Sequence, residues 1–419
     1  MPTAPAKQRN YAVDFWRIYC TIGVAFMHFH WDGMSDGFLA EVLGDTYPPF
    51  CSGGEVLAYF LLIGGYLMVA SYKSKQRKGL TNIPASTQAW RYTAGRFQGM
   101  FPAVFLSTVL GWAVVCGTNN FNPRQWIQSL MVNIWDFTGL DGIGAMGMPS
   151  SLGGNTQRMM GADPGRVMSL NYPLWYISGI FITAVFLYYL IAKNEDNFKC
   201  IWAPFFSIVY LANFGFAEID WYGYREGTVL GMPINMVWVG GGLCMGALLW
   251  YFVDFLKRKT YGKKAKIGLT VLNAVCSVYL IYVAFSNYYE YNMVDANGNW
   301  YNNEQILVPA MCILIICNTL DHDYLTTLLN RPIFGKIGAF SLYWFVCHYP
   351  MYRFSGWLGT EMGFTSYWQY FGVFVGCTTV LGFILMKICK KWFEPLLGRF
   401  FSDPPKKEEA PVPAATAQN

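Results

Sequence analysis

Charged residues are scarce in this chain: Asp, Glu, Lys and Arg make up 13% of its 419 residues. Soluble domains carry roughly 25%, so the composition does not fit a water-exposed surface. The formal net charge is +5, but the basic residues lie in short segments between apolar runs. That placement is typical of membrane topology and does not indicate nucleic-acid binding. The cysteines show neither a CxxC motif nor a Cys/His ligand spacing, so the sequence predicts no metal site.

Hydrophobic residues, by contrast, make up 54% of the chain and form runs of about 20 residues, which is the length that crosses a bilayer core. We therefore predict an all-α, polytopic membrane protein with about ten transmembrane helices. The predicted spans are 11–30, 51–72, 97–116, 172–192, 201–217, 233–255, 267–287, 304–320, 338–358 and 369–389. Residues 1–398 form the predicted membrane domain, and the Pro-, Ala- and charge-rich residues 399–419 a disordered cytoplasmic tail.

The distribution of Lys and Arg predicts the orientation. With the N-terminus inside, nearly all of them fall in cytoplasmic segments or tails. The outer loops hold only Arg124, Arg158, Arg166 and Arg225. An even number of spans places both termini in the cytoplasm. We predict a multi-pass protein of a bacterial cytoplasmic membrane.

The first span carries ionisable residues at membrane depth, where they are expensive and are functional candidates by default. Arg17 and His28 are 11 residues apart, which places them on one helix face with a rise of about 16 Å between them. Asp14 precedes Arg17 by three residues, so we expect the two to pair. His30 lies about 200° round the helix from His28. An equally open interpretation is that Arg17 reaches lipid phosphates and His28 is an interfacial histidine.

Five motifs in order resemble the acyltransferase type 3 family of membrane O-acyltransferases. The first is Arg9-x4-Asp14-x2-Arg17-x10-His28. The others are YFLLIGGYLM (59–68), the basic run with Arg91, Arg96 and Pro102, PLWYIS (173–178), and GKIGAFSLYWFVCHYP (335–350) with Ser341 and His348. The matches run from residue 9 to residue 350. Gly64, Gly99 and Phe345 depart from the residues usual in the family.

The resemblance implies transfer of an acyl group, usually acetyl from acetyl-CoA, to a hydroxyl of a cell-envelope glycan. It implies a catalytic group of His28, Arg17 and Asp14, in which His28 is the base, because an imidazole titrates near neutral pH. Arg17, Arg91 and Arg96 are the expected ligands of the polyanionic acyl-CoA, and acetyl-CoA is the only co-substrate expected. The expected acceptor-binding residues are Glu55, Trp175, Tyr176 and His348.

The expected partners are therefore acyl-CoA, a glycan acceptor and the lipid bilayer. Without a fused soluble domain, either the membrane domain acts alone or a separate extracytoplasmic protein completes the transfer. A secondary transporter of a small polar solute is the main alternative, because it also has many spans, intramembrane charges and Gly/Pro-broken helices. A receptor or scaffold for envelope assembly is a third interpretation, and it predicts that Arg17 and His28 are replaceable.

Overall fold

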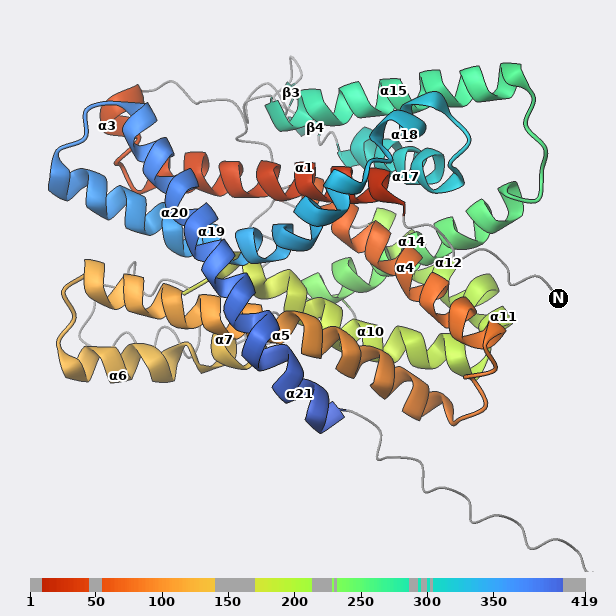
Figure 1. Ribbon diagram of the computed structural model, residues 1–419, viewed down its shortest axis with the longest axis horizontal. Coiled ribbons are helices and arrows are strands. Elements are labelled where there is room, and N and C mark those ends of the chain that lie inside the picture. Colours follow the sequence, from red (N-terminus) through yellow and green to blue (C-terminus); the bar gives the residue numbers. More distant parts are fainter. Residues whose placement is uncertain are drawn as a thin grey trace, which may run out of the picture.

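The computed structural model describes residues 10–44, 55–139, 170–212, 228–229, 232–285, 293–294, 300–301 and 304–401. These residues are almost entirely helical, which confirms the predicted all-α class (Figure 1). The strands among them are two antiparallel pairs of two residues each, β1 (Thr228–Val229) with β2 (Met232–Pro233) and β3 (Met293–Val294) with β4 (Trp300–Tyr301).

The helices of the first half of the chain begin with α1 (Tyr11–Met27), which continues into a π-helical turn, η1 (His28–Asp32). The elements that follow are α2 (Gly33–Ser35), α3 (Ala40–Leu43), η2 (Glu55–Leu57), α4 (Ala58–Arg77), α5 (Ala85–Thr118), α6 (Pro123–Val132), α7 (Ile134–Thr138), η4 (Tyr172–Leu174), α10 (Trp175–Lys193), α11 (Glu195–Asn197), η5 (Phe198–Trp202) and α12 (Ala203–Tyr210).

The helices of the second half pack among those of the first. They are α14 (Ile234–Leu256), α15 (Lys263–Phe285), α17 (Glu304–Leu320), α18 (Tyr324–Leu329), α19 (Pro332–Met362), α20 (Tyr367–Ile388), η7 (Cys389–Phe393) and α21 (Glu394–Phe401). Helix α14 packs against α4, and α19 packs against α1 and α5. Helix α21 extends past the predicted domain end at residue 398. The rest of the predicted disordered tail, 402–419, lies outside the described residues.

Five helices in the described part of the chain are long and apolar enough to cross a membrane by length and composition. They cover 85–118, 175–193, 236–256, 263–285 and 367–399. This shows a multi-pass helical membrane protein, whereas ten crossings stay a prediction. The other five predicted spans also contain helices, but α1 and α17 have 17 residues each and α12 has eight. Helices α4 and α19 are long enough but more polar.

Helix α5 differs from the prediction in its beginning. The apolar run suggested a start at residue 97, but the helix begins after Pro84 and has 34 residues. Arg91 and Arg96 therefore lie on the helix itself and not in the loop before it. Hydropathy misses such an extension, because a helix that projects beyond the lipid is free to be polar on its exposed face.

Helix α1 packs along α19 and also contacts α4, α17 and α18 (Figure 1). Close approach to α19 needs small residues there. A Cβ added to Gly335 would lie 2.5 Å from the Tyr11 ring, and one added to Gly338 would lie 3.0 Å from Asp14. Farther along, Phe26 packs edge-on against Trp344 of α19. This contact line brings the C-terminal end of α1 to the middle of α19.

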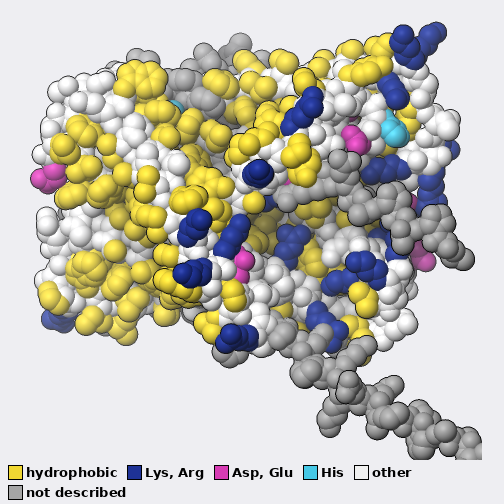
Figure 2. All heavy atoms as spheres, viewed as in Figure 1, with side chains coloured by type: hydrophobic (Ala, Val, Ile, Leu, Met, Phe, Trp, Pro, Cys, Tyr) yellow, Lys and Arg dark blue, Asp and Glu magenta, His cyan; other side chains and the backbone are white. Residues whose placement is uncertain are grey.

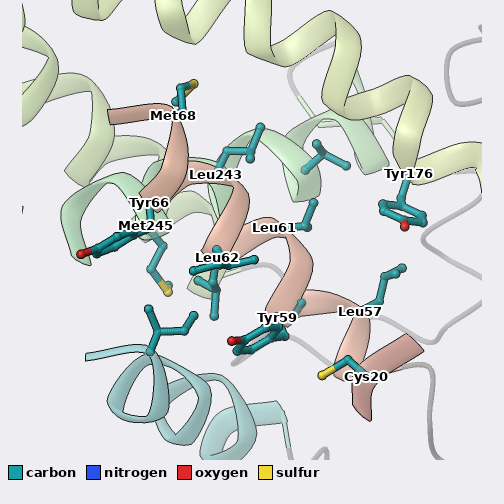
Figure 3. Packing of buried hydrophobic residues seen from close by; sticks show 14 of the residues in the cluster. Cys20, Leu57, Tyr59, Leu61, Leu62, Tyr66, Met68, Tyr176, Leu243 and Met245 are labelled. Carbon is teal, nitrogen blue, oxygen red and sulfur yellow. The ribbon is translucent and has the colours of Figure 1, made fainter. Parts of the chain in front are cut away.

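Helices α4 and α14 form the tightest helix pair, and Figure 3 shows the side chains packed around it. A Cβ on Gly246 would lie 1.9 Å from the Leu62 carbonyl oxygen, and one on Gly65 would lie 1.8 Å from that of Leu243. The sequence GGGLCMG predicts a small-residue packing surface at Gly242 and Gly246, and this is confirmed.

Lys and Arg side chains are unevenly distributed over the surface. Figure 2 shows them over the middle and right of one face, while the left part of that face is mainly hydrophobic and carries few of them. In the same view the N-terminal end of α1 lies to the right (Figure 1). On this face most of the visible Lys and Arg side chains therefore lie toward the side where α1 begins.

Candidate functional site

The last turn of the first long helix is widened. After Met27 the α-helix changes to a π-helical turn that runs from His28 to Asp32. Such turns are rare and are frequent at functional sites. Here the turn brings Asp32 beneath His28, and the His28 Nδ1 atom lies 2.8 Å from Asp32 Oδ2. Because an ionised carboxylate only accepts hydrogen bonds, Asp32 places the proton on Nδ1 and leaves the lone pair on Nε2.

The second half of the site comes from α19. His348 is completely buried, and its Nδ1 atom donates to the Phe345 carbonyl oxygen. This hydrogen bond assigns the proton to Nδ1, so Nε2 again carries the lone pair. Nε2 has no hydrogen-bond partner among the described residues. A buried polar atom left in this way is uncommon and indicates a site for water or a ligand.

A proline fixes the backbone of α19 next to His348. Pro350 has no N–H to donate, so the carbonyl group of Val346 loses its helical partner. The side chain of Asn171, which lies just before α10, replaces it: Asn171 Nδ2 is 2.8 Å from the Val346 oxygen and 3.1 Å from Ser107 Oγ. One buried amide thus ties α5, α10 and α19 together beside His348.

The two histidines meet where the end of α1 packs against the middle of α19. Their ring centres are 5.4 Å apart, with the ring planes inclined by 34°. Tyr349 stands edge-on to His28 at 5.4 Å. Because the side chain of Asp32 is 27% exposed while that of His28 is 9% exposed, the Asp32–His28 pair leads from the surface into the buried cluster.

His30 belongs to different surroundings. Its Nε2 atom lies 2.8 Å from the Tyr367 hydroxyl oxygen of α20, and its ring is parallel to that of Phe371 at 6.4 Å. These contacts place His30 against α20, whereas His28 lies against α19.

An arginine continues the cluster on α19. Arg353 Nη2 donates to the Tyr349 hydroxyl and Arg353 Nε to the Tyr352 hydroxyl, both at 3.3 Å. Tyr352 in turn donates to Asp36 Oδ2 at 3.3 Å. Partial removal from water raises the pKa of Asp36, and the positive charge of Arg353 opposes that rise.

The predicted pair of Asp14 and Arg17 is confirmed: Arg17 Nη1 lies 3.2 Å from Asp14 Oδ1. The Asp14 side chain is 5% exposed and that of Arg17 is 31% exposed. The guanidinium group is close enough to act electrostatically on the hydroxyl groups of Tyr59 and Tyr176. Since α1 is a regular helix up to Met27, the 11-residue spacing keeps its rise of about 16 Å to His28.

The predicted acceptor residues occupy different places. Tyr176 contacts Phe345 edge-on at 5.6 Å, and Phe345 contacts His348 at 5.0 Å, so Tyr176 lies between the Arg17 region and the histidines. Trp175 is buried and packs against Trp238 of α14 at 5.5 Å. Glu55 begins the short helix η2, and the position of its carboxylate lies outside the described residues.

Arg91 and Arg96 lie near the beginning of α5, in a cationic and aromatic cluster with Lys75 of α4. The rings of Tyr92 and Tyr188 stack at 4.3 Å, and the Arg96 guanidinium carbon lies 5.4 Å from the Tyr92 ring centre. Lys75 Nζ lies 5.4 Å from the centre of Tyr188. Burial, and then the like charge of Arg91, lowers the pKa of Lys75.

Asp32 and Tyr349 were not among the residues predicted from the sequence, and Arg353 was given no role, whereas Lys75 belongs to the inner basic segment that was expected to attract the coenzyme A phosphates. The His28-x3-Asp32 spacing was a usable signal, because residues four apart meet on one helix face. Tyr349 and Arg353 carry no such signal, since their proximity to His28 follows from the packing of α1 on α19.

The described helices define a multi-pass helical membrane protein with a buried polar cluster at one end. No protein-family model matches the chain, and no curated protein or solved structure matches it. Membership of the acyltransferase type 3 family stays a prediction from the motifs.

Proposed function

We propose that the protein is a membrane O-acyltransferase. It moves an acyl group from cytoplasmic acyl-CoA to a hydroxyl of an extracytoplasmic or lipid-linked glycan, and the acyl group we propose is acetyl. The observation that carries this proposal is the environment of His28. Its Nδ1 is held by Asp32 at 2.8 Å and its ring faces the buried His348 at 5.4 Å. An imidazole fixed by a carboxylate in this tautomer is suited to act as a general base.

The reaction that follows is a direct transfer. His28 Nε2 accepts the proton of the acceptor hydroxyl as the hydroxyl oxygen attacks the thioester carbonyl carbon. The carbon–sulfur bond then breaks, and the proton passes from His28 to the departing coenzyme A thiolate. Asp32 stabilises the imidazolium ion between these steps, and its removal leaves the ring free to adopt the wrong tautomer.

On the donor side, the cationic cluster at the beginning of α5 is the proposed binding region for the coenzyme A phosphates. Guanidinium groups bind phosphate through paired hydrogen bonds, which suits Arg91 and Arg96. Arg17, paired with Asp14, is the proposed inner contact of the acyl-CoA. The rise of about 16 Å along α1 separates this contact from His28, and the extended pantetheine arm would cover it.

On the acceptor side, we propose that His348 and Tyr176 contact the sugar, because His348 Nε2 is buried without a protein partner and Tyr176 lies toward the Arg17 region. Trp175 stands edge-on to Tyr176 at 6.3 Å and packs on Trp238 at 5.5 Å, so it supports Tyr176. Glu55 is kept as a proposed acceptor ligand on the family resemblance alone.

The proposal also includes the predicted topology: ten crossings, both termini in the cytoplasm, and a bacterial cytoplasmic membrane. The position of most visible Lys and Arg side chains toward the side where α1 begins supports a cytoplasmic N-terminus (Figure 2).

Mass spectrometry of the envelope glycans tests the function. Cells lacking the gene should lose an acetyl-sized increment from one glycan, and the wild-type gene should restore it. We expect His28→Ala to fail to restore it at wild-type protein level, whereas His322→Ala, a change in the segment before α18, restores it. Unchanged glycans in the deletion strain would contradict the proposal.

A secondary transporter also fits a bundle with broken helices, and the π-helical turn in the first helix is a feature of that kind. The two functions differ in their chemistry. Solute flux by the reconstituted protein, with no release of thiol from acetyl-CoA, would favour the transporter.

A further inference from the structure

Arg353 is a partly buried cation whose hydrogen bonds go to neutral groups. Its Nη2 and Nε atoms donate to the Tyr349 and Tyr352 hydroxyls, both at a rather long 3.3 Å. Its Nη1 atom is buried and has no hydrogen-bond partner among the described residues. A guanidinium group has five donors in a planar fork, so one edge of this fork is unused.

The charge of Arg353 is also poorly compensated. Arg17 has Asp14 at 3.2 Å and Lys73 has Glu195 at 2.6 Å, but within the described ranges no carboxylate lies in ion-pair contact with Arg353. Asp36 is reached only through the Tyr352 hydroxyl. A buried charge without a direct counter-ion is costly, and an anionic ligand would relieve that cost.

The location of the cation ties it to the proposed reaction centre. The Arg353 guanidinium carbon lies 5.1 Å from the centre of the Tyr349 ring, and His28 contacts the same ring at 5.4 Å. Because Asp32 lies 2.8 Å from His28 Nδ1, His28, Asp32 and Arg353 share one polar region around Tyr349. Asp32 and Arg353 are partly exposed, so this region reaches the surface of the described structure.

From this arrangement we infer that Arg353 binds a compact oxyanion carried by the sugar acceptor, either a carboxylate or a phosphate. The acceptor is thus an acidic or phosphorylated sugar, whose anion on Arg353 aligns its hydroxyl with His28 Nε2. This inference rests on the proposed acyltransferase function, because it treats the ligand as the acceptor. Bidentate binding of either anion is the interaction for which arginine is best suited.

Direct binding measurements on the full-length protein in lipid nanodiscs test the inference without any turnover. The probes are methyl glucuronide, glucose 1-phosphate and methyl glucoside, which share a hexose ring and differ in charge. We expect at least one of the two anions to bind about tenfold or more tightly than the glucoside, and Arg353→Met to remove the difference. If only methyl glucuronide binds more tightly, the anion of the acceptor is a carboxylate. If only glucose 1-phosphate does, it is a phosphate.

Two further variants separate anion recognition from a structural role. Arg353→Lys keeps the charge without the fork, so it should keep part of the preference for the anion. Arg258→Met changes an exposed arginine on α14's C-terminal side and should bind all three probes as the wild type does. Equal weakening of all three probes by Arg353→Met, or a wild-type protein that does not favour either anion, would overturn the inference.

Acetyl transfer from labelled acetyl-CoA then distinguishes this inference from the proposed function. If both hold, Arg353→Met raises KM for the anionic acceptor about tenfold and lowers kcat by a smaller factor, because the lost contact both binds the acceptor and aligns its hydroxyl with His28. If anion binding depends on Arg353 but the protein never releases coenzyme A, the anion site is supported and the proposed acyltransferase function is contradicted.

Discussion

Two polar clusters lie buried in this apolar bundle, and they differ in how completely their side chains are hydrogen-bonded. Between α15, α17 and α18, Asn273 Nδ2 donates to Asp323 Oδ1 at 3.0 Å and to Thr326 Oγ1 at 3.1 Å. Thr326 Oγ1 in turn donates to Asp323 Oδ2, and Asn318 Oδ1 lies 3.3 Å from the same hydroxyl oxygen. Near the junction of α1 and α19, by contrast, His348 Nε2 and Arg353 Nη1 have no partner among the described residues.

This difference teaches how to distinguish polar groups that hold the fold from polar groups that serve chemistry. A fully satisfied network fixes the packing of its helices and has no capacity left for a ligand. A cluster that keeps buried polar atoms without hydrogen-bond partners lowers the stability of the fold. Its presence indicates that a ligand or water molecule binds those atoms. We call the first the Asn273 network, made of Asn273, Asn318, Asp323 and Thr326. The second is the His28 cluster, made of His28, Asp32, His348, Tyr349 and Arg353.

The largest expected effect falls on the His28 cluster. Asp32→Asn should slow acyl transfer roughly 10²–10³-fold, about 3–4 kcal/mol in activation free energy, because the amide no longer holds the imidazole in the required tautomer. Thermal stability should change little, since Asp32 is partly exposed. Initial rates of coenzyme A release measure this. A variant that loses stability but keeps its rate would place Asp32 with the structural groups.

In the Asn273 network the opposite result is expected. Asp323→Ala leaves Asn273 and Thr326 buried without their acceptor, which should cost about 3 kcal/mol of folding stability. Thermal unfolding in detergent measures the loss, and transfer activity per folded protein should stay within about twofold of the wild type. Loss of activity without loss of stability would break the distinction between the two clusters.

Asn171 is expected to affect both stability and rate, because it donates to the Val346 carbonyl oxygen of α19 close to His348. We expect Asn171→Ala to destabilise the fold by about 2 kcal/mol, as the Val346 carbonyl loses its donor. The rate should also fall, because His348 is two residues further along α19. Circular dichroism melting and coenzyme A release, measured on one preparation, would show both effects; a fall in only one would assign Asn171 to one cluster.

The smallest effect is expected at a histidine that belongs to neither cluster. The His322 ring nitrogen Nδ1 donates to the carbonyl oxygen of the neighbouring Asp321 at 3.1 Å, and the ring contacts Tyr261 at 5.0 Å. His322→Ala should change both stability and rate by less than about 0.5 kcal/mol. A strong effect on the rate would show that loss of a histidine is not informative by itself.

Much of the helical arrangement was predictable from apolar runs, since helices are the ordinary way to satisfy the backbone in lipid. The Asp14–Arg17 pair was also predictable, because residues three apart on a helix are neighbours. The early beginning of α5 was not, because its first turns project beyond the apolar run. The π-helical turn at His28 was missed for another reason: hydropathy carries no information on local helix winding.

The composition of the His28 cluster could be predicted only in part. His28 was recognisable as an ionisable residue in an apolar span, and His348 through its motif. Their contact at 5.4 Å joins residues from opposite ends of the chain, and it depends on the close packing of α1 against glycines of α19. Arg353 looked like an isolated charge, because its meaning depends on Tyr349, Tyr352 and Asp36 around it.

The proposed reaction depends most on His28 acting as the base, and coenzyme A release by purified protein in proteoliposomes tests that role directly. With acetyl-CoA on the side of the N-terminus and acceptor glycan on the other side, the wild-type protein should release free thiol. His28→Ala, folded and inserted to the same extent, should fall about 10²-fold or more, to background. Thiol release by His28→Ala within about threefold of the wild type would contradict that role.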